Sequence, residues 1–364
     1  MANNPMNTIK VLITQAMPGM VVSDDVYTSD LHLVISKDTP LTDKIITRLK
    51  FYAITEFSIY SGDTSTDDTE YVESTFYSDI RKSNSFKLFK NAYNKTSNSI
   101  KDSFDDFVVK NIELNPERLL SDVSEIMLRC NTNIELFHML HSIREYDDTT
   151  YVHSLNVALI CNILGKWLGL KPEEIEIITL GGLLHDIGKL LISPKILLKP
   201  AKLTDEEFSI VKTHTLKGYN ILKDKNLNQR VKNVALMHHE RCDGSGYPNG
   251  FLSHEIDPYA KLVAIADVYD AMTCARVYRG PLCPFEVISL FETEGYLKYD
   301  TRYILTFLEG IVQTYINNSV RLNNQMEGEI ILINKIELSR PTIMVGDTFI
   351  DLTKHRNLYI EALI

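Results

Sequence analysis

The stretch Leu183-Leu184-His185-Asp186-Ile187-Gly188-Lys189 decides the fold of this chain. The residues before it, Pro172 to Leu184, predict a helix, because proline suits the first helical position and the acidic residues after it favour a helix N-terminus. The apolar side chains of this helix indicate that most of it is buried. His185 and Asp186 therefore stand at the end of a buried helix, where an unpaired charge is costly. A metal ion is the natural partner for such a pair, and Lys189, one turn later, can face the same site.

A His-Asp pair at a helix end is more often structural than catalytic, so the rest of the chain has to decide its role. The chain has 364 residues, which is enough for two or three domains, and its 44% hydrophobic and 24% charged residues are typical of a globular protein. The net charge of −10 argues against a nucleic-acid polymer or an anionic membrane as the main partner. A small anionic ligand remains open if a few cations converge locally.

The cysteines indicate a reducing compartment. They are odd in number, scattered and without a C-x-x-C pair, and they are Cys130, Cys161, Cys242, Cys274 and Cys283. This usage argues against disulfides and against a thiolate zinc site. The first ten residues are polar, and no apolar run approaches the ~18 residues that a membrane span needs. We therefore expect a cytoplasmic protein without a membrane segment.

The pattern along the chain predicts a mainly α protein with two small additions. Residues 1–62 are expected to form a small mixed α/β module, with a short helix from Thr42 through Leu49 and strands at 10–13, 21–27, 31–36 and 57–61. Residues 63–110 are expected to be an acidic linker followed by one long helix from about 76 to 110, which either packs on its own domain or serves in dimerisation. Residues 325–364 alternate apolar and polar side chains, which indicates a small antiparallel β appendage.

Between these additions, residues 111–324 show only helical patterns, so we expect an all-helical domain. One helix begins at Asn115-Pro116-Glu117, and Thr204-Asp205-Glu206-Glu207 is a capping box that opens another. The remaining helices are expected at about 134–143, 150–168, 172–184, 231–239, 258–274, 284–291 and 300–316.

Polar side chains in this helical region stand where a simple bundle would carry apolar ones. They are His153, His185, Asp186, His214, His238, His239, Asp267 and Asp270. Each has a simpler interpretation, such as a hydrogen-bonded interior histidine or a helix-capping group. Together they bring imidazoles and carboxylates from five helices, which is how metals are held in helical domains. His with Asp and no thiolate suits iron, manganese or zinc, and a bridging carboxylate suits a pair of metals.

A glycine-dense loop, Arg241 to Gly250, follows the second histidine pair directly. Gly246 permits close backbone approach, and Tyr247-Pro248 offers a stacking or hydrogen-bonding edge, although an ordinary turn would use the same residues. Arg276 and Arg279 follow Asp267 by nine and twelve residues. Arginine forks suit phosphate or the edge of guanine; the alternative is two surface cations.

These residues together resemble the HD-GYP family, metal-dependent phosphodiesterases of the HD superfamily that hydrolyse cyclic di-GMP. The resemblance runs from Tyr151 to Arg279 and more loosely to Phe307. The motifs that carry it are His185-Asp186-Ile187-Gly188-Lys189, Lys199-Pro200-Ala201-Lys202-Leu203-Thr204, His238-His239-Glu240-Arg241, Asp243-Gly244-Ser245-Gly246-Tyr247-Pro248 and the segment from Ile265 to Ala271. The N-terminal module, with Met17-Pro18-Gly19-Met20, more weakly resembles domains found ahead of HD-GYP domains.

The resemblance implies a role for each residue of the site. The metal ligands would be His153, His185, Asp186, His214, His238, His239 and Asp267. Lys189 would face the phosphate and act with Asp186 in catalysis. The substrate would be bound by Gly246, Tyr247, Pro248, Asp270, Arg276 and Arg279.

The chain also departs from the family pattern. Val277 interrupts a common Arg-Pro-Tyr-Arg run, and Thr301 replaces a frequent proline at a helix start. Some members hold a third metal through a glutamate at the position of Thr149, which cannot replace a carboxylate. A two-metal site is therefore expected, with Glu145 or Asp148 as the acids that could approach from nearby.

The resemblance implies that cyclic di-GMP is hydrolysed to linear pGpG, and the sequence leaves open whether the product is cleaved further to GMP. The first alternative is a cyclic dinucleotide receptor with weak catalysis, but none of the ligands nor Lys189 is lost. The second is another HD-superfamily phosphohydrolase acting on nucleotides or (p)ppGpp, against which the Gly-Tyr-Pro loop and Arg276 argue. A preference for a hybrid cyclic dinucleotide and assembly as a homodimer are left open by the sequence.

Overall fold

The structure is a computed structural model, and it describes residues 8–12, 16, 19–27, 33–42, 45–46, 48–49, 54, 56–60, 75–143, 150–197, 199, 203–273 and 282–364. The chain divides into two compact units, which are treated separately. The described parts of the smaller unit lie within residues 8–60 and 194–208, and the larger unit contains the other described residues. The predicted acidic linker falls on residues that are not described.

The smaller unit contains two antiparallel strand pairs. Strand β1 (Thr8–Leu12) pairs with β4 (Glu56–Tyr60), and β2 (Val26–Tyr27) pairs with β3 (Leu33–Ile35). The predicted helix start is confirmed, because the Thr42 hydroxyl accepts the N–H of Ile45 at 3.2 Å. Apolar side chains from all four strands form a common core, whose most buried members are Val22, Leu41, Ile46, Leu49 and Ile59.

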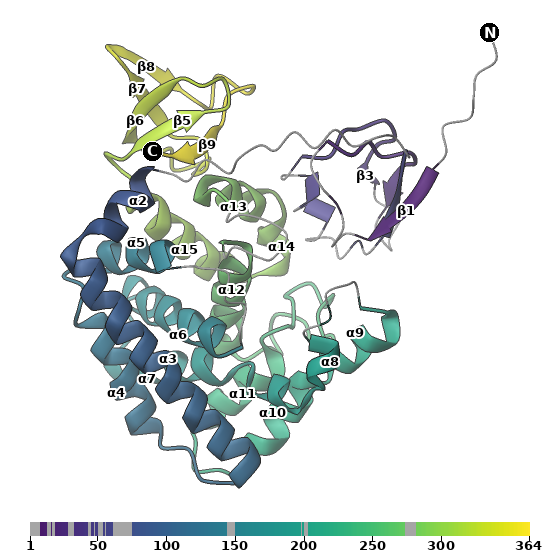
Figure 1. The fold of residues 1–364 in the computed structure, drawn as a ribbon, viewed down its shortest axis with the longest axis vertical. Coiled ribbons are helices and arrows are strands. Elements are labelled where there is room, and N and C mark those ends of the chain that lie inside the picture. The colour runs from purple at the N-terminus through teal and green to yellow at the C-terminus, as the bar shows by residue number, and fades with distance from the viewer. Residues whose placement is uncertain are drawn as a thin grey trace. The chain divides into compact units, whose positions relative to one another are not determined.

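The larger unit is built mainly of helices, as predicted (Figure 1). Their bounds are α2 (Thr75–Lys82), α3 (Asn84–Lys110), α4 (Pro116–Met127), α5 (Asn133–Ile143), α6 (Thr150–Trp167), α7 (Pro172–Leu184), the 3₁₀ helix η2 (Ile187–Leu191), α10 (His214–Leu222), α11 (Gln229–Met237), α12 (Pro258–Thr273), α13 (Pro284–Leu290), the π-helix η3 (Phe291–Gly295), α14 (Tyr296–Lys298) and α15 (Thr301–Gln313). Two further helices, α8 (Pro194–Leu197) and α9 (Asp205–Lys212), lie between η2 and α10 in the sequence.

Several helix starts follow directly from their capping residues. The Asn115 side chain accepts the N–H of Arg118 at the start of α4. At α9 the capping box is confirmed: Thr204 Oγ1 accepts the N–H of Glu207 at 3.2 Å, and the Glu207 carboxylate accepts the N–H of Thr204 at 2.8 Å. Asp300 caps α15, so a proline is not needed at Thr301.

Helices α6, α7 and α12 form the buried centre of the larger unit. Leu155, Ile160 and Leu183 have no exposed surface. Gly182 on α7 permits close approach to α6, because a Cβ at this position would lie 3.1 Å from the Cα of Ala158. This close packing brings the end of α7, which carries the His-Asp pair, beside the helix that carries His153.

The prediction of one long helix over residues 76–110 is wrong in one respect. The segment forms two helices, α2 and α3, that are separated at Ser83. The Ser83 hydroxyl accepts the N–H of Phe86 at 3.1 Å and caps α3. The Ser83 hydroxyl takes the backbone N–H that a continuous helix would bond to an earlier carbonyl. The spacing of apolar residues does not reveal such a break.

A five-stranded antiparallel sheet follows the helices, in the order β8-β7-β6-β5-β9. Its strands are β5 (Ser319–Leu322), β6 (Glu327–Leu332), β7 (Thr342–Val345), β8 (Thr348–Asp351) and β9 (Ile360–Leu363). Strand β5 precedes residue 325, where the β appendage was expected to begin. Its four residues are too few to show a clear alternation, yet it pairs with both β6 and β9.

The mainly α fold class is confirmed, with the small strand pairs at one end of the sequence and the five-stranded sheet at the other. No helix within the described ranges combines the length and the apolar character needed to cross a bilayer.

Candidate metal centre

Asp186 lies at the centre of the histidine cluster. It follows the end of α7 and precedes η2, and only 1% of its surface is exposed. Its Oδ1 lies 3.2 Å from Nε2 of His214 and 3.7 Å from Nε2 of His238. Its Oδ2 lies 3.3 Å from Nε2 of His185 and 3.6 Å from Nε2 of His153. The two carboxylate oxygens therefore face two different groups of imidazoles.

Three of these imidazoles are oriented by backbone carbonyls that lie shortly before them in the sequence. The Nδ1–H groups of His185, His214 and His238 donate to carbonyl oxygens three or four residues earlier, at 2.7, 2.7 and 3.0 Å. A carbonyl can only accept, so each ring carries its proton on Nδ1 and directs the lone pair of Nε2 toward Asp186. Histidines that bind a metal through one ring nitrogen typically donate the other N–H to a carbonyl or carboxylate in this way.

The fourth imidazole, His153, is oriented by carboxylates instead. It lies on α6, and its two acidic partners lie one turn apart on α12. Nδ1 of His153 is 2.8 Å from Oδ2 of Asp270, and Nε2 is 3.0 Å from Oδ1 of Asp267. Burial disfavours the charged ring, but hydrogen bonds to the two carboxylates outweigh burial and raise the pKa of His153 to about 10.

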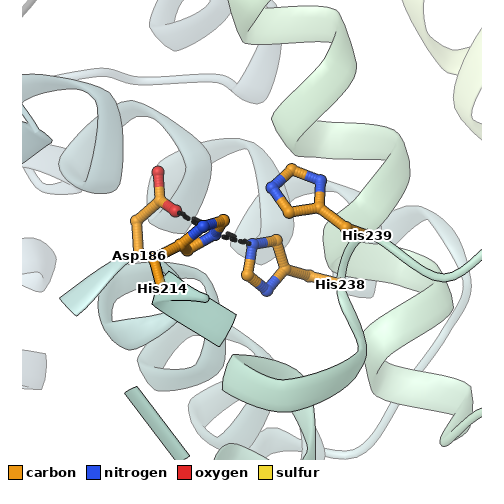
Figure 2. Close-up of side chains that lie close together, drawn as sticks. All are labelled: Asp186, His214, His238 and His239. Carbon is orange, nitrogen blue, oxygen red and sulfur yellow. Dashed lines mark hydrogen bonds and ion pairs between the residues drawn. The ribbon is translucent and has the colours of Figure 1, made fainter. Parts of the chain in front are cut away.

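The remaining predicted ligand, His239, lies beside both groups. Figure 2 shows the rings of His214, His238 and His239 together with the carboxylate of Asp186. Nδ1 of His239 is 3.8 Å from Oδ2 of Asp267. The described part of the chain contains two groups of side chains whose ligand atoms all lie within 4.8 Å of one another inside each group. The first group is Asp186, His214, His238 and His239, and the second is His153, His185 and Asp186. Asp186 belongs to both groups.

The site fits divalent metal ions. Nε2 of His185 and Oδ1 of Asp186 are buried but make no hydrogen bond, which is costly unless another ligand satisfies them. Burial lowers the pKa of His238 to about 4, so this ring is neutral at physiological pH. Burial alone would raise the pKa of Asp186, but the charge of Lys189 and the neighbouring imidazoles hold it well below its ordinary value. Neutral imidazoles and an ionised carboxylate are the ligand forms that bind metal.

Lys189 reaches the same carboxylate from the partly exposed side of the site. Its Nζ lies 2.5 Å from Oδ2 of Asp186, and 26% of its side chain is exposed. Gly188 before it lets η2 pack tightly on α10, because a Cβ at this position would lie 1.9 Å from the carbonyl oxygen of His214. The structure thus places this lysine where the sequence predicted it.

The glycine-dense loop lies directly against the second histidine pair. Tyr247 donates its backbone N–H to the carbonyl of His239 at 3.2 Å, and the two rings have centroids 4.7 Å apart. A Cβ on Gly246 would lie 2.4 Å from the Cα of Glu240, so only glycine fits there. Pro248 is exposed, and Lys212 Nζ lies 5.5 Å from the centroid of the Tyr247 ring.

The other predicted substrate contacts are placed differently. Asp270 is 1% exposed and its Oδ2 accepts the Nδ1–H of His153, which favours an orienting role over direct contact with a substrate. The other predicted positions lie outside the described residues, namely Arg276, Arg279, Val277, Thr149, Glu145 and Asp148.

Sequence reasoning missed the groups that hold the glycine-dense loop and the histidines in place. The clearest is Glu240, which is 3% exposed and accepts the N–H groups of Asn249 and Phe251. Because Glu240 follows two histidines that are metal-ligand candidates, its sequence position alone does not indicate a separate role in holding the loop. The backbone carbonyls of Gly182, Val211 and Val234 were also missed, although a histidine at the end of a helix regularly has a carbonyl three or four residues earlier within reach.

Comparisons with known proteins identify the family of the helical domain. A family model described as HD domain matches residues 116–302, about half of the chain. The cyclic di-GMP phosphodiesterase response regulator RpfG of Xanthomonas campestris pv. campestris is 33% identical over 199 residues, which cover 54% of this chain and 52% of RpfG. The 3'3'-cGAMP-specific phosphodiesterase 1 of Vibrio cholerae is 41% identical over 145 residues, covering 40% of this chain and 34% of that enzyme.

This chain therefore spans about half of RpfG and about a third of the Vibrio enzyme. Among solved structures, Bd1817, an HDG"Y"P protein from Bdellovibrio bacteriovorus, aligns with a TM-score of 0.48 at 20% identity. That alignment covers 83% of this chain and 98% of Bd1817.

Proposed function

The chain belongs to the HD domain family, and from that premise we propose that it is a metal-dependent phosphodiesterase that hydrolyses cyclic di-GMP. The relatives named as cyclic dinucleotide phosphodiesterases support this proposal, as does the resemblance to the HD-GYP family. The observation that carries it is the placement of Asp186, whose two oxygens face two separate groups of imidazoles. A carboxylate so placed is suited to bridging two cations.

We infer that the cofactor is a pair of divalent ions, with iron or manganese favoured over zinc by the His and Asp ligands without thiolate. One ion would be held by Asp186, His214, His238 and His239, and the other by His153, His185, Asp186 and Asp267. When bound, such ions supply Lewis-acid charge stabilisation and lower the pKa of water toward ~7.

The residues of the chain itself would then bind and orient the dinucleotide. Lys189 is partly exposed and can leave Oδ2 of Asp186 to donate to the phosphate oxygens, where negative charge grows during hydrolysis. Tyr247, whose ring lies beside that of His239, and the exposed Pro248 would contact the nucleotide, and Gly246 lets the loop approach closely. We keep Arg276 and Arg279 as proposed contacts to phosphate or guanine, and Asp270 as the residue that orients His153.

The main alternative is a receptor that binds a cyclic dinucleotide without turnover. The complete set of ligands and the position of Lys189 disfavour it, because a receptor needs neither. The Vibrio relative makes a hybrid dinucleotide the second substrate to test. Assembly as a homodimer and a cytoplasmic location stay predictions from the sequence.

Product chromatography on metal-replete protein tests the proposal. Cyclic di-GMP should be converted to linear pGpG and then to GMP, with 3'3'-cGAMP and cyclic di-AMP run in parallel. Binding of cyclic di-GMP without any linear product would establish the receptor alternative. Faster hydrolysis of 3'3'-cGAMP would reassign the substrate, and cleavage of only mononucleotides or (p)ppGpp would overturn the proposal in favour of another HD phosphohydrolase.

A further inference from the structure

Glu240 occupies an unusual position between the metal centre and the glycine-dense loop. It follows His239 directly, is 3% exposed, and has both carboxylate oxygens engaged by the same loop. Oε1 accepts the N–H of Asn249 at 2.8 Å, and Oε2 accepts the N–H of Phe251 at 3.0 Å. A buried carboxylate that accepts two backbone N–H groups makes strong, charge-assisted hydrogen bonds.

The loop is closed around this carboxylate by its own backbone. Asp243 and Leu252 form an antiparallel bridge at the base of the loop, and Ser253 donates its N–H to the carbonyl of Cys242 at 3.1 Å. The bridge joins the two ends of the loop, while Glu240 binds the backbone of the segment that follows Pro248. Without Glu240, the N–H groups of residues 249 and 251 would lose their acceptors.

The same loop is joined to the metal ligands at its other side. Tyr247 donates its N–H to the carbonyl of His239, and Gly246 packs on the backbone of Glu240 so closely that no Cβ fits. The backbone of Tyr247 is therefore bound to the carbonyl of His239, and the two residues that lie two and four positions after it, Asn249 and Phe251, are bound to the carboxylate of Glu240.

We propose that Glu240 is a positioning residue for substrate binding, which fixes the Gly246-Tyr247-Pro248 segment against the metal centre. This inference rests on the proposed function, because it takes Tyr247 as a contact to the dinucleotide. Glu240 itself touches neither the ligand atoms of the histidines nor the substrate. Its effect should therefore appear in the affinity for the dinucleotide rather than in metal content or in turnover at saturation.

The substitution Glu240→Gln keeps the shape of the side chain but leaves one acceptor oxygen, so one of the two loop N–H groups faces an amide donor. We expect the Kd for cyclic di-GMP, measured by calorimetry in the slow Lys189→Ala background, to rise about ten- to hundredfold. The KM of the otherwise unaltered enzyme should rise in step, while kcat falls by less than threefold. Bound metal and hydrolysis of the small diester bis(p-nitrophenyl) phosphate, which has no base for the loop to hold, should stay within twofold.

Glu292 offers a matched control within the same unit. It lies on η3, is half-buried, and its carboxylate also accepts two backbone N–H groups, those of Leu338 and Ser339. Glu292→Gln removes an equivalent acceptor from a loop beside the C-terminal sheet. It should lower thermal stability like Glu240→Gln but leave the Kd for cyclic di-GMP within twofold.

Amide hydrogen exchange gives a readout that needs no substrate. Exchange of a peptide covering residues 243–252 should accelerate in Glu240→Gln and stay unchanged in Glu292→Gln. If Glu240→Gln fails to fold, Glu240→Asp keeps both acceptor oxygens but withdraws them by one methylene, and a rise in Kd with retained metal then supports the proposal.

Three results would overturn it: a Kd for Glu240→Gln within twofold of its parent, an equal rise in Kd for both glutamate variants, or loss of bound metal from Glu240→Gln. Failure of the proposed function is distinguishable from these. A wild-type protein that binds cyclic di-GMP without hydrolysing it would refute the phosphodiesterase activity, while the ratio of Kd values would still decide the role of Glu240.

Discussion

The imidazoles around Asp186 are oriented by two different means. His185, His214 and His238 are held by backbone carbonyls three or four residues earlier in the sequence. His153 instead depends on Asp267 and Asp270, which are 114 and 117 residues away in the sequence. The first kind of support forms with the local helix, whereas the second forms only when α6 and α12 pack.

This difference has an electrostatic consequence. Burial lowers the pKa of His238 to about 4, so this carbonyl-held ring is neutral at physiological pH. Two carboxylates stabilise the protonated ring of His153 and raise its pKa to about 10. His238 is thus neutral without any further change, whereas His153 would have to exchange the proton on Nε2 for a bound cation to act as a ligand.

The largest expected effect is on kcat and comes from Lys189, which lies against the carboxylate of Asp186. Lys189→Ala should lower kcat about 10²–10³-fold, because it removes a cation placed where charge grows on the phosphate. Metal content should be retained, since Lys189 is not a ligand. Lys217→Ala is the matched control, because Lys217 lies nearby but donates to the carbonyl of Leu191. Equal turnover of the two variants would show that Lys189 has no catalytic role.

A smaller effect, on metal affinity, is expected when the carboxylate that orients His153 is replaced. Asp270→Asn keeps a hydrogen-bond acceptor for Nδ1 but removes the charge, so the affinity for one of the two ions should fall about 10- to 100-fold. Metal titration followed by elemental analysis measures this change. Asp257→Asn, a carboxylate at the start of α12 that binds Asn233, should leave both affinities unchanged. If Asp270→Asn also binds both ions normally, carboxylate support is not what orients His153.

The smallest effect concerns a histidine outside the site that is also held by a carbonyl. Nε2 of His138 donates to the carbonyl of Thr314 at 3.1 Å, and burial lowers its pKa to about 4. The unfolded chain, with a pKa near ~6.5, binds this proton first as the pH falls. The free energy of unfolding should therefore decrease below about pH 6.5, by up to about 1.4 kcal/mol per pH unit until about pH 4.

His138→Gln tests this expectation, because glutamine can donate to the same carbonyl but does not titrate. The slope of stability against pH between 4 and 6.5, measured by urea unfolding of wild type and variant, should be shallower in the variant. Identical slopes would mean that His138 is protonated as readily in the folded protein as in the unfolded chain.

The same division explains how much could be predicted from the sequence. Local sequence signals predicted most helices, the capping box of Thr204 and Glu207, and the buried helix α7 that ends just before His185. The comparisons confirm the resemblance to the HD-GYP family that these motifs carry. They do not test the roles of the single site residues, which stay proposals.

What the sequence could not predict depends on contacts between distant segments or on short elements. Asp270 was expected to contact the substrate, and only the packing of α12 on α6 shows that it is turned toward His153. Strand β5 has four residues and is defined by its partners β6 and β9. The break at Ser83 depends on one side-chain cap that a periodic apolar pattern does not reveal.

The number of metal ions per chain tests the central claim, that Asp186 joins two ion positions. Elemental analysis of protein purified without chelator and reloaded anaerobically with iron or manganese should give close to two ions per chain. Asp186→Asn, which alters both positions at once, should give close to none. A wild-type value of one or zero, or two ions retained by Asp186→Asn, would contradict the account.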